Sequence, residues 1–99
     1  MPYRIEFTPK AREHFATFAA RERALLRDGI RKHLTHQPAL ETRHRKPLRP
    51  NTLAGFRLRI RDLRVYYDVF EGPDPLVLVQ AIGIKVRNLV FVGGVEIKL

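Results

Sequence analysis

The stretch GFRLRIRDLRVYYDVF, residues 55–70, decides the fold, because apolar residues alternate with arginines along its first half. Residues two apart on a β-strand point to the same face of a sheet. The alternation therefore predicts two strands, residues 56–61 and 64–70, joined as a hairpin by a turn at Asp62. One face of this hairpin is apolar and belongs to the core, and the other face carries the arginines.

Upstream of the hairpin, the pattern predicts one strand and then two helices. Tyr3–Phe7 alternates apolar and charged residues, which is typical of a short half-buried strand. Thr8 followed by Pro9 is a helix start, with threonine as the N-cap and proline in the first turn. A second helical pattern runs from about residue 21 to 36 and is ended by Pro38. Two helices this close together predict an antiparallel helical hairpin.

Downstream, a turn over residues 72–75 precedes the nearly continuous apolar run Leu76–Ile82. A run of this kind predicts a central strand covered on both faces. We expect Gly83 to interrupt that strand, residues 88–92 to form a further short strand, and Gly93-Gly94 to loosen the tail.

The order of these elements predicts an α+β fold. It consists of an N-terminal strand, an antiparallel helical hairpin and then three to four antiparallel strands in one twisted sheet. The helices should cover one face of the sheet, and the arginines should point away from the other face.

Composition limits the remaining possibilities. A chain of 99 residues predicts a single domain over residues 1–99. The absence of cysteine excludes disulfides and thiolate zinc sites, and it suits a reducing cytoplasm. We find no signal peptide, and the longest apolar stretch, residues 76–84, is too short to span a bilayer. We therefore expect a cytoplasmic protein that does not interact with membranes.

Positive charge is the strongest global feature. The formal net charge is +9 and the pI is about 10.9. Residues 43–64 contain eight Lys or Arg and a single acidic residue, Asp62. Such a concentration points to phosphate-rich partners, an acidic protein or an anionic surface.

The arginine row suits phosphate. Arg57, Arg59 and Arg61 should project about 7 Å apart, a spacing close to that of phosphates along one nucleic-acid strand. Arg64 shares their face if the hairpin is tight, and the guanidinium fork matches phosphate oxygens in pairs. The alternative is a solvated face that deters sheet aggregation. Like charges across a hairpin cost stability, so the uncompensated cluster favours an anionic partner.

Several motifs together resemble the RelE/ParE superfamily of bacterial type II toxin–antitoxin toxins. They are, in chain order, YRIEFTPKA (3–11), HLTHQP (33–38), LRIRDLRVYYDV (58–69) and AIGIKVRNLVF (81–91). The resemblance lies in their order and spacing and covers nearly the whole chain. It implies a compact RelE-like domain in which two helices pack against a twisted antiparallel sheet.

The resemblance also implies a function. RelE-type members are ribonucleases that cut messenger RNA on the ribosome, ParE-type members poison DNA gyrase, and an antitoxin silences both. We expect a ribosome-dependent, metal-free endoribonuclease that uses 2′-hydroxyl attack, inhibits translation and is neutralised by a cognate antitoxin. The alternatives are a ParE-type gyrase inhibitor and a basic nucleic-acid-binding module without toxicity. The expected partners are the antitoxin, the ribosome and mRNA, or gyrase.

The family pattern also assigns site residues. Arg57 and Arg59 match basic positions before the hairpin turn, Arg64 matches the basic residue that opens the next strand, and Lys85 keeps the charge of a family arginine after Gly83. These four are the expected catalytic residues. Further RNA contacts are expected from Arg45, Lys46, Arg49, Arg61 and Arg87.

Proton transfer is less clearly assigned, because Phe91 stands where some members have tyrosine. Arginine is too weak an acid or base for the task. Lys85, Tyr66 and His44 are the candidates, although His44 also fits a surface loop histidine. We expect no cofactor and no metal, since His33 and His36 lack a third ligand at a recognised spacing.

Overall fold

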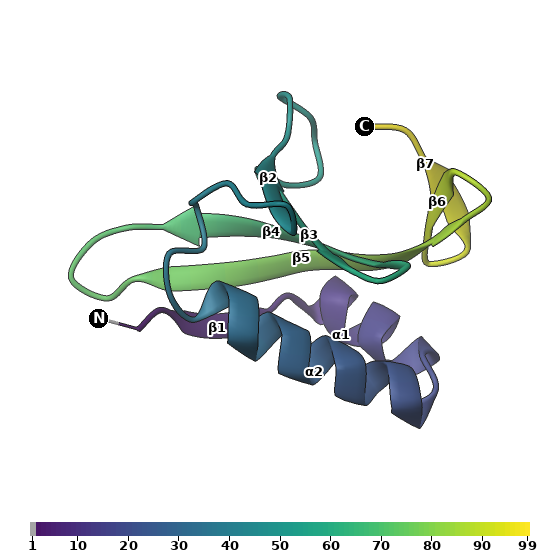
Figure 1. Cartoon of the computed structure of the whole chain (residues 1–99), viewed down its shortest axis with the longest axis horizontal. Coiled ribbons are helices and arrows are strands. Elements are labelled where there is room, and N and C mark those ends of the chain that lie inside the picture. Colours follow the sequence, from purple (N-terminus) through teal and green to yellow (C-terminus); the bar gives the residue numbers. More distant parts are fainter. Residues whose placement is uncertain (1) are drawn as a thin grey trace.

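Two helices pack on one face of a seven-stranded sheet in the structure, a computed structural model that describes residues 2–99 (Figure 1). The strand order is β2-β3-β4-β5-β6-β7, and β1 also pairs with β5. The elements are β1 (Arg4–Phe7), α1 (Pro9–Thr17), α2 (Ala20–Leu34), β2 (Arg45–Pro47), β3 (Phe56–Ile60), β4 (Leu63–Phe70), β5 (Leu76–Val86), β6 (Leu89–Val92) and β7 (Val95–Ile97). The predicted α+β class is confirmed.

The helical hairpin begins where the sequence predicts. The Thr8 hydroxyl accepts a hydrogen bond from the backbone N–H of Ala11 at 3.1 Å, and Pro9 occupies the first turn. At the start of α2, the Glu22 carboxylate accepts from the N–H of Ala19 at 3.1 Å, which satisfies another N-terminal donor. No helix in residues 2–99 combines the length and the apolar composition needed to cross a bilayer.

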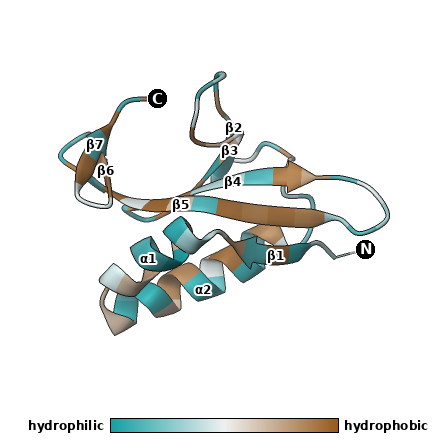
Figure 2. Cartoon of the chain, turned by 180° about the vertical axis from the view of Figure 1, so that it is seen from behind, coloured by the Kyte–Doolittle hydropathy of each residue, from teal (hydrophilic) through white to brown (hydrophobic). Residues whose placement is uncertain are grey.

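The main core lies between α2 and the sheet. A stripe of α2 packs on the apolar faces of the central strands, and Figure 2 shows how hydrophobic β5 is along most of its length. Tyr67 is fully buried, stacks on Phe56 with 5.4 Å between ring centroids, and donates its hydroxyl to the Pro38 carbonyl at 2.7 Å. The buried residues of this core are Ala11, Leu26, Ile30, Leu34, Leu58, Leu63, Val65, Tyr67, Val77, Val79 and Ile82.

β5 is longer than predicted, because it continues through Gly83. That residue pairs with Arg64 of β4 on one side and with Val92 of β6 on the other. A Cβ atom at position 83 would lie 2.5 Å from the Phe91 carbonyl oxygen. The expected interruption was wrong: the missing side chain permits close approach of β6 rather than ending the strand.

The C-terminal tail is also more ordered than predicted. Gly93 and Gly94 have φ angles of 58° and 79°, and together they turn the chain back so that β7 pairs with β6. The irregular stretch before β3 likewise contains a short strand, β2, which pairs with β3. The sheet therefore has more strands than expected, and β1 joins it in parallel to β5.

The face opposite the helices is partly covered. Figure 1 shows β2 with its following loop and the β6–β7 hairpin rising on this side of the sheet. A second, smaller core forms there around Ala54, Tyr66 and Ala81. Leu48, Leu53, Val90, Val92 and Ile97 pack against it. The outward arginines therefore lie beside apolar walls rather than on an open surface.

We predict that Gly83→Ala lowers stability by about 1–3 kcal/mol, because the new methyl group meets the backbone of β6 and forces the two strands apart. Urea unfolding followed by circular dichroism measures the loss. An unchanged unfolding midpoint would show that β6 can move away at no cost.

Candidate anion-binding site

The strand register brings the predicted arginines onto one face of the sheet. Arg59 lies opposite Arg64, and Arg57 lies opposite Tyr66, across the β3–β4 pair. β3 ends at Ile60, so Arg61 is not the third member of the row. It lies in the turn, where its φ of 55° is left-handed. The shared face predicted for Arg57, Arg59 and Arg64 is confirmed.

Four cations and one tyrosine line a cavity of about 200 Å³ on this face, which we call the basic cavity. Its cations come from four different strands, and its apolar walls come from the loop after β2 and from the C-terminal end of the chain. The lining residues are Lys46, Leu48, Arg57, Arg64, Tyr66, Lys85, Val90, Ile97 and Leu99.

A second hollow of about 690 Å³ adjoins the basic cavity, and we call it the turn hollow. The two share Arg64 and Lys85, so these side chains lie at their common border. The turn hollow also receives Arg59, which additionally donates to the Arg43 carbonyl at 3.0 Å. Its lining residues are Arg59, Arg61, Asp62, Arg64, Ile84, Lys85, Val86, Arg87 and Asn88.

The cations of the basic cavity lack anionic partners. No salt bridge within residues 2–99 involves Arg57, Arg64 or Lys85. The Nε atom of Arg57 is buried and makes no hydrogen bond to that part of the chain. Burial, followed by repulsion from Arg59, lowers the pKa of Arg57 from its ordinary value. A buried donor without a partner is costly, and an acceptor bound in the cavity would remove this cost.

The guanidinium group of Arg64 has more hydrogen-bond partners in the protein than that of Arg57. It is 5% exposed, and its Nη1 donates to the carbonyl oxygens of Arg61 at 2.8 Å and Leu63 at 3.0 Å. Burial lowers its pKa first, and repulsion from Arg57 lowers it further. The tight turn of the β3–β4 hairpin therefore orients this guanidinium, while most of its donors remain available to an anion.

Arg45, which we expected to be a further RNA contact, lines neither the basic cavity nor the turn hollow. It pairs with Leu58, so its side chain points to the helix side of the sheet, where it is 9% exposed. Its guanidinium donates to the carbonyl oxygens of His33, His36 and Leu40. Arg45 therefore ties the end of α2 to β2 and is not a surface cation.

Three other residues considered in the sequence analysis, Arg49, His44 and Phe91, do not line the basic cavity. Arg49 lines a separate hollow of about 440 Å³ formed with the 50–55 loop. The ring of His44 lies 4.8 Å from that of His33 and does not line the basic cavity. Phe91 pairs with Ile84, a residue of the helix-side core, so a hydroxyl group at position 91 would not point into the basic cavity.

Within residues 2–99, no group of three histidine, cysteine or carboxylate side chains is placed to hold a metal ion. The apolar walls formed by Val90, Ile97 and Leu99 escaped the sequence analysis. They belong to the C-terminal hairpin, which the Gly93-Gly94 pair could have indicated as a turn between two strands.

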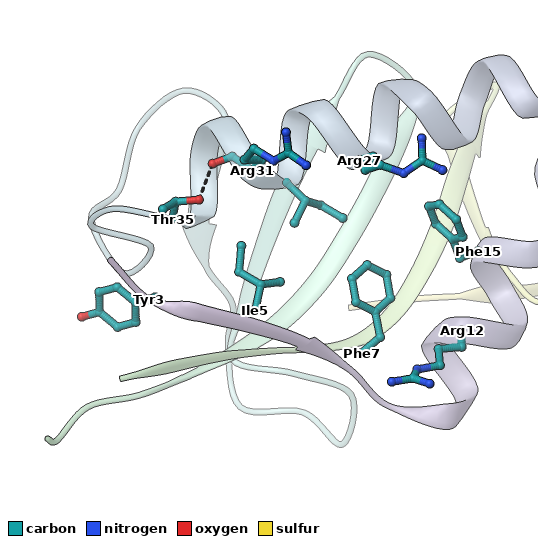
Figure 3. A pocket seen from close by; sticks show the side chains of 9 residues that line it. Tyr3, Ile5, Phe7, Arg12, Phe15, Arg27, Arg31 and Thr35 are labelled. Carbon is teal, nitrogen blue, oxygen red and sulfur yellow. Dashed lines mark hydrogen bonds between the residues drawn. The ribbon is translucent and has the colours of Figure 1, made fainter. Parts of the chain in front are cut away.

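A further concave surface lies between β1 and the helices, away from the basic cavity. This β1 groove has a volume of about 520 Å³ and is shown in Figure 3, with Ile5 and Phe7 pointing from β1 toward the helical hairpin. The guanidinium carbon of Arg27 lies 5.7 Å from the centre of the Phe15 ring. The groove is lined by Tyr3, Ile5, Phe7, Arg12, Phe15, Arg27, Ile30, Arg31 and Thr35, and is thus apolar with a rim of arginines.

β1 also presents an unpaired edge beside this groove. Within residues 2–99 it pairs with no strand except β5, and the N–H groups of Arg4 and Thr8 donate to that side, each at 3.0 Å. Just before β1, the N–H of Tyr3 donates to the Thr35 carbonyl at 2.8 Å. In a parallel pair alternate residues point their backbone groups the same way, so those of Ile5 and Phe7 face outward. An extended segment could add a strand here.

Comparison with known proteins supports the fold. No protein-family model matches the chain, and no curated protein matches it. Among solved structures, it is similar to a chain of the RelBE2 toxin–antitoxin complex from Mycobacterium tuberculosis. The TM-score is 0.72 and the identity 24%, over 86% of this chain and 93% of that chain. The RelE-like fold implied by the sequence resemblance is therefore confirmed.

Adjacent residues of β2 provide a matched stability test. We predict that Arg45→Ala lowers the unfolding free energy by about 1–3 kcal/mol, because it leaves carbonyl groups at the end of α2 without a donor. Lys46→Ala, on the opposite face, should change it by less than about 0.5 kcal/mol. Denaturant unfolding of both variants decides the point, and equal losses would contradict the structural role of Arg45.

Proposed function

We propose that this protein is the toxin of a type II toxin–antitoxin system and that it cuts messenger RNA on the ribosome. One observation carries the proposal: Lys46, Arg57, Arg64 and Lys85 converge on one cavity, and none of them forms a salt bridge within residues 2–99. The RelE-like fold and the similarity to a chain from a toxin–antitoxin complex support it.

The site suits a reaction in which a 2′-hydroxyl group of the RNA is the nucleophile. Attack of the 2′-hydroxyl on the adjacent phosphate builds negative charge on a five-coordinate phosphorus. Preorganised donors that stabilise such charge are often the largest single contribution to catalysis. Arg57 and Arg64 supply these donors, and Lys85 adds charge where the basic cavity and the turn hollow meet.

The turn hollow supplies further contacts for the RNA chain. In this proposal Arg59, Arg61 and Arg87 bind phosphates that neighbour the scissile one, and Lys46 binds on the other side of the basic cavity. Arg49 is too far along the loop to share either hollow and would contact RNA only beyond them. Cationic contacts of this kind position the backbone without reading sequence.

The β1 groove is the proposed docking surface for the antitoxin. An amphipathic segment would place apolar side chains on Ile5, Phe7 and Phe15 and acidic side chains on the arginine rim. The net charge of +9 favours an acidic partner and fast association. The unpaired edge of β1 offers backbone hydrogen bonds to the same segment.

Inhibition of DNA gyrase is the second candidate, in keeping with the ParE-type members that the sequence also resembles. Two features favour it: lysine in place of arginine at position 85, and an apolar Phe91 directed to the helix side. A gyrase inhibitor would use the basic face to bind protein rather than to cleave RNA.

We predict that Arg57→Ala combined with Lys85→Ala relieves growth arrest when the protein is expressed in bacteria. It should slow mRNA cleavage at least about 100-fold, because two donors at the reacting phosphate are lost. Growth curves and mapping of mRNA ends provide the measurement. Arg21→Ala with Lys32→Ala removes the same charge from exposed helix positions and should remain toxic.

Survival of full toxicity in the Arg57/Lys85 double variant would contradict the assignment of the basic cavity. Growth arrest accompanied by DNA damage, with intact mRNA, would instead favour the gyrase alternative.

We also predict that Arg27→Glu with Arg31→Glu weakens neutralisation by the antitoxin, because the reversed rim repels an acidic segment. Co-expression with the protein encoded by the adjacent gene tests this through recovery of growth. Arg21→Glu with Lys32→Glu changes the net charge equally and lies outside the groove. If both double variants are neutralised equally well, the antitoxin docks elsewhere.

A further inference from the structure

The proposed cleavage needs a proton donor that the arginines do not supply. When the bond from phosphorus to the 5′-oxygen breaks, that oxygen leaves as an alkoxide unless it receives a proton. Arginine holds its proton too tightly to act as the donor. Of the residues that line the basic cavity, Tyr66 is the only titratable one that is not a cation.

Tyr66 neighbours both arginines of the cavity. It lies opposite Arg57 across the β3–β4 pair and two residues after Arg64 on β4, so all three side chains share one face. Its ring is 2% exposed and packs in the smaller core with Ala54 and Ala81. The ring is therefore held in one place while the side chain contributes to the cavity wall.

The hydroxyl group of Tyr66 lacks a partner, unlike those of the other tyrosines. Tyr3 donates to Glu71 at 2.5 Å, and Tyr67, the next residue along β4, donates to Pro38 at 2.7 Å. The hydroxyl group of Tyr66 makes no hydrogen bond within residues 2–99, although the hydroxyl of a largely buried tyrosine usually finds one. The buried Arg57 Nε at the same cavity also lacks a partner within residues 2–99, whereas the Tyr66 hydroxyl is not fully buried and is open to a ligand.

An oxygen-rich ligand satisfies both groups at once. A phosphodiester offers two non-bridging oxygens, which suit guanidinium donors, and a bridging 5′-oxygen, which suits a hydroxyl donor. A carboxylate has no equivalent of the bridging oxygen. The combination of two arginines and an unpartnered tyrosine hydroxyl therefore fits a phosphodiester that is to be cleaved.

We infer that Tyr66 is the general acid of the reaction and gives its phenolic proton to the leaving 5′-oxygen; this rests on the proposed nuclease function. The 2′-oxygen forms a bond to phosphorus and loses its proton to water. The bond to the 5′-oxygen breaks, and its electron pair stays on that oxygen, which takes the Tyr66 proton. The products are a 2′,3′-cyclic phosphate and a 5′-hydroxyl, and water returns a proton to the phenolate.

The surroundings of Tyr66 suit a donor. Burial raises the pKa of its phenol, and Arg64 and Arg57 oppose that rise. The phenol is therefore protonated before reaction, as an acid must be. The same two guanidinium groups stabilise the phenolate after the proton has left. Lys85 lines both hollows and is assigned to charge stabilisation instead.

The experiment compares two ribosome-bound mRNAs, one normal and one with sulfur in place of the 5′-oxygen at the cut site. A thiolate leaves without a proton, so loss of a general acid no longer matters with that substrate. Tyr66→Phe should cut normal mRNA about 100-fold or more slowly than the wild type. It should cut the sulfur-containing mRNA at the wild-type rate.

Two control variants accompany this comparison. Tyr67→Phe alters the neighbouring tyrosine on the other face of β4 and should cut both substrates at nearly the wild-type rate. Arg57→Ala should be slow on both, because its loss affects charge on phosphorus. Tyr66→Phe should be as stable as the wild type in denaturant unfolding, because its hydroxyl group has no partner, whereas Tyr67→Phe should lose stability.

Four results would overturn the assignment. In the first, Tyr66→Phe cuts normal mRNA at the wild-type rate; in the second, it cuts both mRNAs equally slowly. In the third, the sulfur-containing mRNA restores the rate of Lys85→Ala and not that of Tyr66→Phe. In the fourth, Tyr66→Phe loses as much stability as Tyr67→Phe. If the wild-type protein cuts neither mRNA, the proposed nuclease function fails together with this inference. Cleavage by the wild type with no rescue of Tyr66→Phe removes only the role of Tyr66.

Discussion

The antiparallel pairing of β4 with β5 is the interaction on which the rest of the structure depends. The two strands pair from Leu63 with Ile84 to Phe70 with Leu76. On its far edge β5 receives β1 along its first half and β6 along its second half. One strand therefore joins the N-terminal strand, the hairpin and the C-terminal strands, and Gly83 permits the close approach that completes this arrangement.

This central pair also separates the two faces of the molecule. Val65, Tyr67 and Val79 face the helices and form the main core, while Arg64 and Tyr66 face the opposite side. Because side chains alternate along a strand, the stable core and the basic cavity are built on the same residues of the chain. Movement of the cavity residues would therefore require movement of the core, which holds Arg64 and Tyr66 in place.

The like charges of the basic cavity lower the stability of the folded protein. Arg57 and Arg64 repel each other, both are partly removed from water, and neither forms a salt bridge within residues 2–99. Folding alone would be better served by neutral residues at these positions. In the proposed reaction a phosphodiester would supply the missing negative charge. A transition state with more charge would supply more, which is the arrangement that favours reaction over mere binding.

The sequence by itself determined the elements whose physical causes are local. The Thr8-Pro9 start of α1, the alternation of residues 56–70 and the shared face of Arg57, Arg59 and Arg64 all follow from capping and from the period of a strand. Only the tertiary structure decided the roles of Gly83, Arg45 and Tyr66, because each depends on a partner far away in the chain. From the local sequence Gly83 is expected to interrupt a strand, yet in the fold it permits the close approach of β6. Arg45 is expected to be a surface cation, yet it donates to carbonyl groups at and beyond the end of α2. Tyr66 is buried on the charged face only because the distant C-terminal hairpin and the 48–54 loop cover it.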